Sequence, residues 1–266
     1  MSRFSEMFCA LRSQRRAALM PFLQTGYPDL PTIEQMVPAI VASGADAVEL
    51  GVPFSDPIAD GPTMQGAAFR ALRRGVRLAD ALDLVRRLRV GVDVPIALMS
   101  YANPLLSYGV ERFVRDAADA GVDGVIAADI PADEAGSLIA AAREIQLDTI
   151  FLVAPTSTEQ RLRVVVEATT GFLYCVSVTG VTGAREHLGD EVGKLIGRVR
   201  EVTDLPAVVG FGISTPDHAR TVARIADGVI VASALYQALE NARDPVEAAV
   251  AFLRPFAQAL RADRRP

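Results

Sequence analysis

The chain has 266 residues, of which 50% are hydrophobic and 22% are charged, a composition typical of a globular protein. Its formal net charge of −5 argues against binding to nucleic acid or to an anionic membrane surface, because both require positive charge. The two cysteines, Cys9 and Cys175, provide neither a disulfide framework nor the spacing of metal ligands. Neither a signal peptide nor an apolar stretch long enough to span a membrane is visible, so we expect a cytoplasmic protein without a metal site.

Short apolar runs alternate with amphipathic segments along the whole chain. The pattern predicts a first helix over residues 4–12 and then eight strands, at residues 18–23, 47–50, 95–101, 124–130, 149–154, 172–178, 207–212 and 228–233. These runs are apolar on both faces, as parallel strands covered by helices are. Helical patterns follow them at residues 31–43, 62–74, 78–89, 110–120, 133–145, 158–168, 191–202, 216–225 and 244–261.

This alternation predicts an α/β protein with one domain over residues 1–266. Eight strand–helix units fit a single (β/α)8 TIM barrel of about 250 residues with an extra N-terminal helix. A doubly wound open sheet is the alternative. Three helix-to-strand junctions share a small residue followed by aspartate, in SGADAVEL, AGVDGVIAADI and RIADGVIVAS, which indicates repeated βα units.

Polar side chains gather where the predicted strands end. Glu49 ends the second run, and Asp60 follows it after a loop that two prolines stiffen. Tyr101 follows the third run and Asp129 the fourth. Since the catalytic groups of barrels come from the carboxyl ends of strands, we expect these side chains on one rim. Two carboxylates in different environments can hold different protonation states, which acid–base catalysis requires.

The last predicted strands carry features of a phosphate site. Gly180 and Gly183 lie in a loop after the sixth strand, where backbone N–H groups can point at an anion. Gly210 and Gly212 allow a ligand to approach the backbone closely. Ser233 lies where a short helix is expected to begin, and barrel phosphate sites use the loops after strands seven and eight.

Each of these residues also has a purely structural interpretation. Glu49 could be a buried carboxylate paired with an arginine, although no arginine lies in a strand-like run. Asp60 could cap the helix that begins at residue 62, and Asp129 could fix its own loop. Tyr101 and Tyr174 could be core tyrosines with a bonded hydroxyl.

Six segments resemble the alpha-subunit family of tryptophan synthase, and the resemblance extends over nearly the whole chain. They are PFLQTGYPD (21–29), VELGVPFSDPIADGP (48–62), LMSYANPL (98–105), FLVAPTS (151–157), VTGVTGAR (178–185) and VGFGIS (209–214). The resemblance implies a single (β/α)8 barrel. It also implies a carbon–carbon lyase of tryptophan biosynthesis that cleaves indole-3-glycerol phosphate to indole and glyceraldehyde 3-phosphate without a cofactor or metal.

The resemblance also implies roles for single residues. Glu49 would move protons to indole C3 and from the side-chain hydroxyl, and Asp60 would accept a hydrogen bond from the indole N–H. The implied substrate-binding residues are Phe22, Tyr101, Asp129, Tyr174, Thr182, Gly183, Phe211, Gly212, Ala232 and Ser233. Ala232 stands where the family usually has glycine, so a methyl group there could crowd the phosphate.

A beta subunit that carries pyridoxal phosphate is the implied partner, in an α2β2 assembly. The loop with Pro53, Asp56 and Pro57 would lie at that contact, although an aspartate before proline is also common in turns. Three other hypotheses stay open. They are a stand-alone lyase that releases indole, a non-catalytic activator of a beta subunit, and a phosphosugar isomerase or epimerase.

Overall fold

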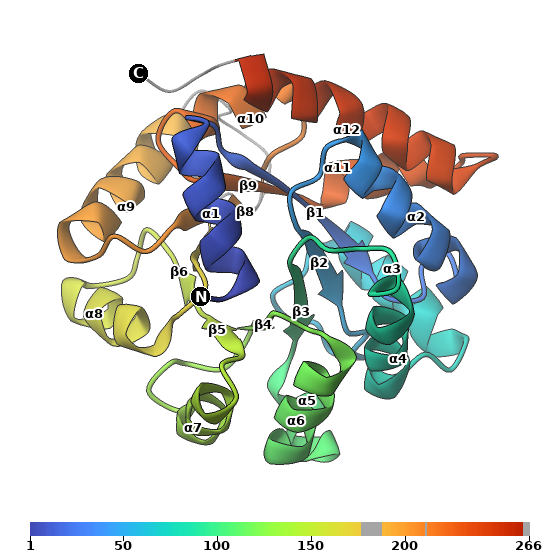
Figure 1. The fold of residues 1–266 in the computed structure, drawn as a ribbon, viewed down its shortest axis with the longest axis horizontal. Coiled ribbons are helices and arrows are strands. Elements are labelled where there is room, and N and C mark those ends of the chain that lie inside the picture. Colours follow the sequence, from blue (N-terminus) through green and yellow to red (C-terminus); the bar gives the residue numbers. More distant parts are fainter. Residues whose placement is uncertain (177–187, 211, 263–266) are drawn as a thin grey trace.

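One parallel sheet forms the centre of the protein. The structure, a computed structural model, describes residues 1–176, 188–210 and 212–262. Its strands run in the order β5-β4-β3-β2-β1-β9-β8-β7-β6, and every pairing is parallel (Figure 1). Their bounds are β1 Ala18–Gln24, β2 Val48–Gly51, β3 Ile96–Ser100, β4 Gly124–Ala127, β5 Asp148–Ile150, β6 Leu152–Val153, β7 Leu173–Val176, β8 Ala207–Gly210 and β9 Gly228–Val231.

The two edges of this sheet belong to one continuous piece of chain. β5 pairs with β4, and β6 pairs with β7, while only Phe151 separates β5 from β6. The Phe151 carbonyl accepts the N–H of Tyr174 at 3.1 Å, so the hydrogen bonding continues around the ring. The predicted eight-stranded barrel is therefore confirmed, with its fifth strand divided by Phe151 into β5 and β6. The open-sheet alternative is wrong.

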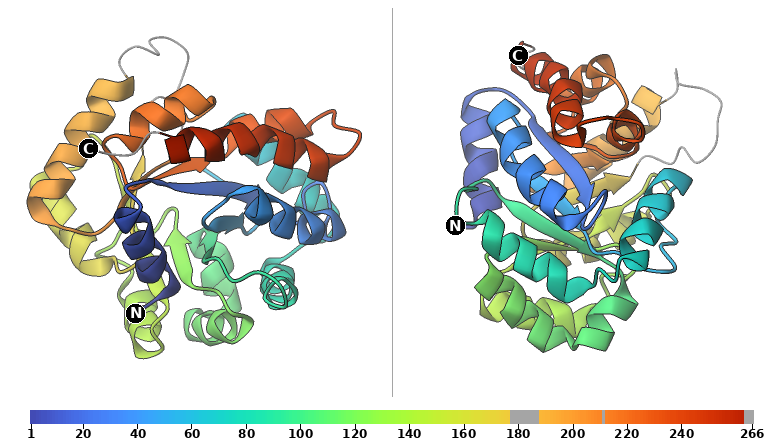
Figure 2. Two further views of the ribbon diagram at one scale, coloured as in Figure 1. Left: turned by 45° about the horizontal axis from the view of Figure 1, so that its top comes forward. Right: turned by 90° about the vertical axis from the view of Figure 1, so that its right-hand side faces the viewer.

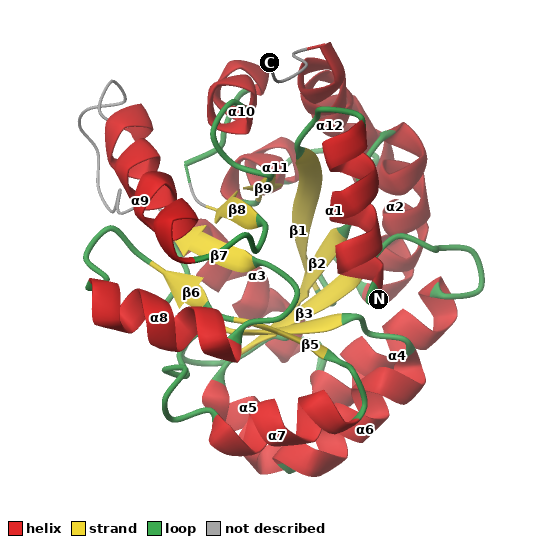
Figure 3. Ribbon diagram, turned by 60° about the vertical axis from the view of Figure 1, so that its left-hand side comes forward, coloured by secondary structure: helices red, strands yellow, loops and turns green. Residues whose placement is uncertain are grey.

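Helices surround the strands on all sides (Figure 3). Within the described residues they are α1 Arg3–Ser13, α2 Leu30–Ser43, α3 Pro62–Arg73, α4 Leu78–Leu88, α5 Ala102–Tyr108, α6 Val110–Ala120, α7 Gly136–Glu144, α8 Glu159–Ala168, α9 Leu188–Val202, α10 Pro216–Ala223, α11 Ser233–Leu239 and α12 Pro245–Ala262. None of them combines the length and the apolar character needed to cross a membrane.

The extra N-terminal helix is present and covers one end of the barrel. α1 carries Phe4, Phe8 and Leu11 into the barrel interior, where the ring centroid of Phe4 lies 5.3 Å from that of Phe172, the residue before β7. In the right-hand view of Figure 2, α1 lies at one end of the molecule and α3 at the other. α1 therefore covers the amino-terminal end of the barrel, and the carboxyl ends of the strands are the end where barrel active sites lie.

Some predicted boundaries were wrong. The strands predicted to reach residues 101 and 130 end at Ser100 and Ala127, because the apolar sequence continues into loops beyond the last paired residue. Helix α7 begins at Gly136, three residues later than its pattern predicted. Helix α5 was not predicted, because its seven residues are too few to show a helical period.

Side chains alternate between the barrel interior and the helical layer. Along β1, Ala18, Met20 and Phe22 belong to the interior cluster, whereas Leu19 and Leu23 pack with the surrounding helices. Both faces are apolar, which explains the continuous hydrophobic runs of the sequence. The same alternation directs Glu49 of β2 toward the interior, between Leu50 and Val48 of the outer layer.

The repeated aspartate junctions bind neighbouring strands together at the amino-terminal end. In each junction the aspartate N–H donates to the carbonyl of a residue on the adjacent strand, and the carboxylate accepts the N–H of that same residue. An arginine then neutralises each carboxylate. The pairs are Asp46 with Leu19, Asp123 with Ile96 and Asp227 with Ala207, and the arginines are Arg16, Arg89 and Arg200.

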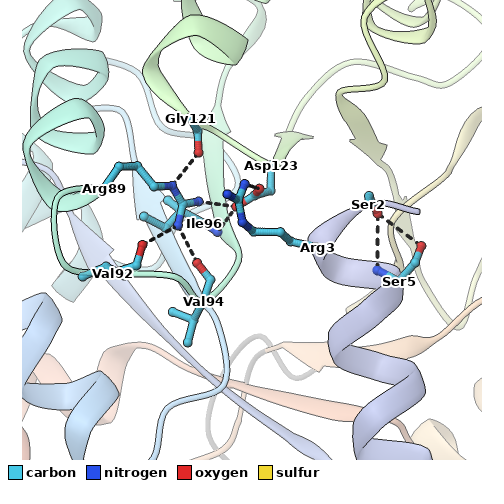
Figure 4. A network of polar contacts seen from close by, with 9 residues as sticks. All are labelled: Ser2, Arg3, Ser5, Arg89, Val92, Val94, Ile96, Gly121 and Asp123. Carbon is cyan, nitrogen blue, oxygen red and sulfur yellow. Dashed lines mark hydrogen bonds and ion pairs between the residues drawn. The ribbon is translucent and has the colours of Figure 1, made fainter.

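Asp123 forms the most connected of these junctions (Figure 4). Its carboxylate accepts the Ile96 N–H at 2.8 Å and binds the guanidinium groups of Arg89 and Arg3, the latter at 2.8 Å. Arg89 also donates to the carbonyls of Gly121, Val92 and Val94. This network joins α1, the end of α4 and the starts of β3 and β4, and it lies opposite the rim that carries Glu49.

We expect Asp123→Asn to lower the free energy of unfolding by about 3 kcal/mol. The substitution keeps an acceptor for Ile96 but leaves the mostly buried Arg89 without its counter-charge. Urea unfolding measures the change. Asp83→Asn is the control, because its ion pair with Arg86 is exposed and contributes less than about 1 kcal/mol. Equal losses in both variants would contradict a structural role for the Asp123 network.

Candidate active site

Glu49 is a fully buried carboxyl group in the barrel interior. Its neighbours in the sheet are Phe22 on β1 and Ala97 on β3. The side chain is 0% exposed, and neither carboxyl oxygen has a hydrogen-bond partner among the described residues. Loss of hydration, and secondarily the nearby charge of Asp60, raises the pKa of Glu49 to about 8. Among the described residues, no arginine pairs with Glu49.

Asp60 lies in the loop between β2 and α3 and approaches Glu49 from the rim. The Asp60 N–H donates to the Pro57 carbonyl at 3.0 Å, and the Gln65 side chain donates to the Asp60 carbonyl at 2.8 Å. The residue that caps α3 is Gly61, with no side-chain hydrogen bond at that cap, so Asp60 is not a helix cap. Burial raises the pKa of Asp60 to about 6, while the Tyr101 hydroxyl acts in the opposite direction.

The two carboxyl groups therefore differ in protonation near neutral pH. With its pKa at about 8, Glu49 holds its proton, and with its pKa at about 6, Asp60 is largely ionised. The cause is the difference in burial, since Glu49 lies inside the sheet and Asp60 on a loop that is partly exposed. One site thus offers a proton donor and an anionic hydrogen-bond acceptor.

Two tyrosines complete this polar cluster. The Tyr101 hydroxyl makes no hydrogen bond of regular geometry with another described residue, but it lies near enough to Asp60 to affect the pKa of that carboxyl. Burial, followed by the charges of Glu49 and Asp60, raises the pKa of Tyr174. The Tyr174 ring lies directly over Gly210, where a Cβ atom would overlap the ring. Glycine at 210 thus lets Tyr174 extend toward the rim.

Apolar side chains line the interior beside these polar groups. The Phe22 ring lies over Gly51, next to the strand segment that carries Glu49. Met99, Ile126 and Leu152 belong with or pack against the same interior cluster, which also contains Phe22 and Tyr174. The sequence analysis did not select these three residues. Counting every second position along each strand would have identified them, because these positions face the interior.

The Asp129 side chain forms a hydrogen bond to the backbone at the rim of the barrel. Its carboxylate accepts the N–H of Ala102, the first residue of α5, at 2.7 Å. The preceding residue, Tyr101, packs against Phe54 with ring centroids 5.3 Å apart. Asp129 therefore fixes the turn that holds Tyr101, which belongs to the neighbouring loop after β3 and not to the loop of Asp129 itself.

The residues predicted to hold phosphate are described in part. Gly212 follows β8 and has a φ of +76°, a conformation that side chains disfavour. Ser233 begins α11 after β9, and β8 pairs with β9, so these two residues follow neighbouring strands. Ala232 occupies the N-cap position of α11 with a φ of −123° and a ψ of −91°. Thr182, Gly183 and Phe211 lie outside the described residues.

The predicted partner-contact residues differ in exposure. Pro53 and Pro57 are buried within this chain, whereas Asp56 is exposed and accepts a hydrogen bond from the Ser55 hydroxyl at 2.5 Å. The neighbouring Ile58 is the more accessible apolar group, with 80% of its surface exposed. Within the described part of the chain, no group of three or more His, Cys, Asp or Glu side chains has an arrangement that could hold a metal ion.

Known proteins resemble this chain in sequence over nearly its whole length. A sequence profile described as "Tryptophan synthase alpha chain" matches residues 8–264. The tryptophan synthase alpha chain of Acidiphilium cryptum is 48% identical over 274 residues, spanning 100% of this chain and 99% of that protein. The alpha chain of Geobacter sulfurreducens is 51% identical over 241 residues, spanning 91% of each chain.

Solved structures agree with the sequence comparison. An open form of tryptophan synthase from M. tuberculosis superposes with a TM-score of 0.90 at 42% identity, over 98% of this chain and 99% of that chain. The alpha subunit from Legionella pneumophila superposes with a TM-score of 0.91 at 35% identity, over 98% of each chain. The chain described here therefore belongs to the tryptophan synthase alpha chain family.

Proposed function

We propose that this protein cleaves indole-3-glycerol phosphate to indole and glyceraldehyde 3-phosphate, as the alpha subunit of a tryptophan synthase. Family membership makes it a lyase-type enzyme of tryptophan biosynthesis. The specific retro-aldol reaction, the residues that perform it and a cytoplasmic setting are parts of the proposal. The observation that carries it is the fully buried Glu49 carboxyl group, without a hydrogen-bond partner among the described residues, close enough to the Asp60 carboxyl group for the charge of Asp60 to raise its pKa.

The reaction needs a proton donor, a proton acceptor and a group that stabilises positive charge. Glu49 donates its proton to indole C3, which converts the ring to an indolenine-like cation. The bond from C3 to the side chain then breaks, as the glycerol hydroxyl loses its proton to the Glu49 carboxylate and becomes the aldehyde. Glu49 ends the cycle protonated, so the protons balance. A buried carboxyl group whose pKa is about 8 suits both steps.

Asp60 supplies the electrostatic part of this mechanism. Its ionised carboxylate accepts a hydrogen bond from the indole N–H, and this bond strengthens as the ring becomes positive. Phe22 and the interior apolar side chains hold the ring, and Tyr101 and Tyr174 position the polar end of the site. Gly212 and Ser233 hold the phosphate group, together with Thr182, Gly183, Ala232 and Phe211.

The proposed partner is a pyridoxal-phosphate-dependent beta subunit. Two exposed apolar side chains near the rim support a protein contact there, Ile58 in the loop after β2 and Leu106 on α5. Pro53 and Pro57 would act by shaping this loop, because both are buried, and Asp56 is accessible to a partner. A stand-alone lyase would form indole at the same rate with and without a beta subunit. A non-catalytic activator would form no indole in either case.

The deciding experiment is an assay of the purified chain with indole-3-glycerol phosphate, with and without a beta subunit. Indole formation that rises strongly on adding the beta subunit supports the proposal. Turnover that the beta subunit does not change indicates a stand-alone lyase. If neither mixture forms indole but the chain still activates a beta subunit, the protein is a non-catalytic activator and the proposed reaction is wrong.

We expect Glu49→Gln to lower the cleavage rate by about 10²–10⁴-fold, because glutamine can neither give nor take the proton. Indole release in a spectrophotometric assay measures the loss. Glu34→Gln is the matched control, since Glu34 lies on the surface in an exposed pair with Arg87. A Glu49→Gln variant with more than about a tenth of wild-type turnover would rule out Glu49 as the acid–base group.

The same substitution is expected to stabilise the protein in a pH-dependent way. Below about pH 4.5 Glu49 is protonated in both the folded and the unfolded chain. As the pH rises toward 8, only the folded chain must keep the proton, so the free energy of unfolding of the wild type falls. Glutamine does not titrate, so Glu49→Gln gains about 3 kcal/mol over the wild type between pH 4.5 and pH 7. Urea unfolding at both pH values tests this expectation, and a constant difference would contradict it.

The pH profile of kcat/KM is expected to be bell-shaped. Activity rises as Asp60 ionises near pH 6 and falls as Glu49 loses its proton near pH 8. Because the two groups interact, the apparent pKa values of the profile belong to the pair and not to either residue alone. Asp60→Asn removes the acidic limb and leaves the alkaline limb. A wild-type profile that stays flat between about pH 5 and pH 9 would show that neither group controls the reaction.

A further inference from the structure

Tyr236 of α11 makes a buried hydrogen bond to the end of β1. Its hydroxyl accepts the backbone N–H of Gln24, and both residues are 2% exposed. Gln24 is the last residue of β1, two positions after Phe22, and Tyr236 lies one helical turn after Ser233. The bond therefore connects the strand that carries the aromatic wall of the site to the helix that begins at the predicted phosphate position.

The geometry of the sheet explains why this N–H needs a side-chain partner. β1 pairs with β9 only over Ala18–Pro21, because β9 ends at Val231 and the chain then turns into α11. On the other side of β1, Thr25 donates its N–H to the Gly51 carbonyl. The Gln24 N–H points to the side where the neighbouring strand has ended, and the Tyr236 hydroxyl takes the place of the missing carbonyl. A buried N–H without a partner would cost about 1–3 kcal/mol.

Aromatic stacking holds the Tyr236 ring in this position. The Tyr27 ring stacks on it with centroids 5.3 Å apart and planes at 27°. The guanidinium carbon of Arg70, on α3, lies 5.0 Å from the Tyr27 ring centroid and forms a cation–π contact with that ring. Helices α3 and α11 also pack against each other. Tyr236 is thus supported by two segments that are distant from it in the sequence, residues 24–27 and helix α3.

Two further bonds extend the connection to both ends of the site. The Tyr236 N–H donates to the Ala232 carbonyl at 3.3 Å, which fixes the first turn of α11 and with it Ser233. The Gln24 side chain donates to the Gly51 carbonyl at 2.9 Å, two residues after Glu49 on β2. A displacement of Tyr236 would therefore shift the start of α11 relative to the strands that carry Phe22 and Glu49.

We infer that Tyr236 is a positioning residue that sets the spacing between the phosphate end of the site at Ser233 and the aromatic end at Phe22. This inference rests on the proposed function, in which one substrate molecule has both a phosphate group and an indole ring. The spacing matters because the substrate reaches both ends at once only when they lie at the correct separation. Tyr236 acts through Gln24 and α11 and does not itself contact the reacting atoms.

The effect should appear in binding more than in chemistry. Phosphate and ring contacts are made in the ground state and in the transition state alike, so their loss raises KM and leaves kcat nearly unchanged. We expect Tyr236→Phe to raise KM for indole-3-glycerol phosphate about tenfold, the equivalent of one buried hydrogen bond, with kcat within about threefold of the wild type. The dissociation constant of sn-glycerol 3-phosphate, which has the phosphate end but no indole and so does not span the two ends, should stay within about threefold of the wild-type value.

The matched control is Tyr108→Phe, which also removes one hydrogen-bonded phenolic hydroxyl. The Tyr108 hydroxyl donates to Asp116 at 2.6 Å between α5 and α6, away from the interior cluster. KM, kcat and urea unfolding are measured for the wild type and both variants, and calorimetry gives the dissociation constant of sn-glycerol 3-phosphate. Tyr108→Phe should leave KM and this constant unchanged.

The outcomes separate positioning from a purely structural role. A rise in KM for Tyr236→Phe alone, with the dissociation constant of sn-glycerol 3-phosphate unchanged, supports the inference. A loss of stability with KM unchanged overturns it, and so does a fall in kcat with KM unchanged or an equal rise in KM and in the dissociation constant. If the wild type forms no indole, the proposed function fails, and the dissociation constant of indole-3-glycerol phosphate, measured by calorimetry for the wild type and both variants, then takes the place of KM in supporting or overturning the positioning role.

Discussion

A carboxyl group buried without a hydrogen-bond partner among the described residues is the constraint on which the site depends. Glu49 occupies an interior position of β2 that an apolar side chain would fill at lower cost, since burial of its ionised form is unfavourable. The closed barrel holds it there because the sheet fixes the backbone and the apolar interior excludes water. That environment gives the group the proton affinity that a general acid needs near neutral pH. In the proposed function, stability and catalysis therefore oppose each other at this residue.

The barrel separates these two requirements in space. At the amino-terminal end, aspartates bind neighbouring strands, each neutralised by an arginine, and α1 closes the interior. At the carboxyl-terminal end, the carboxyl oxygens of Glu49 and the hydroxyl of Tyr101 have no hydrogen-bond partner of regular geometry among the described residues. Interactions that stabilise the fold are thus concentrated opposite the rim where polar groups stay available for a substrate.

The rim is held by bonds between segments that are distant in sequence. Asp129 fixes the start of α5 and so the position of Tyr101, and Tyr236 fixes the start of α11 against the end of β1. Gly210 provides the space for Tyr174. Each contact orients a residue of the site through the backbone. The loops after the strands thereby acquire a definite geometry without strand pairing of their own.

The sequence by itself determined the strand–helix alternation, the N-terminal helix and the position of Glu49 and Asp60 near one rim of the barrel. These follow from local patterns, because apolar runs, glycine and proline positions and a strand-end carboxylate are visible along a single stretch of chain. The family resemblance extended the same argument to Phe22, Tyr174 and Ser233. Only the tertiary structure decided that Asp60 does not cap a helix, that Asp129 does bond to its neighbouring loop, and that Gln24 meets Tyr236. The difference in pKa between Glu49 and Asp60 also arises only on folding, because burial depends on side chains from all around the barrel, which no local pattern contains.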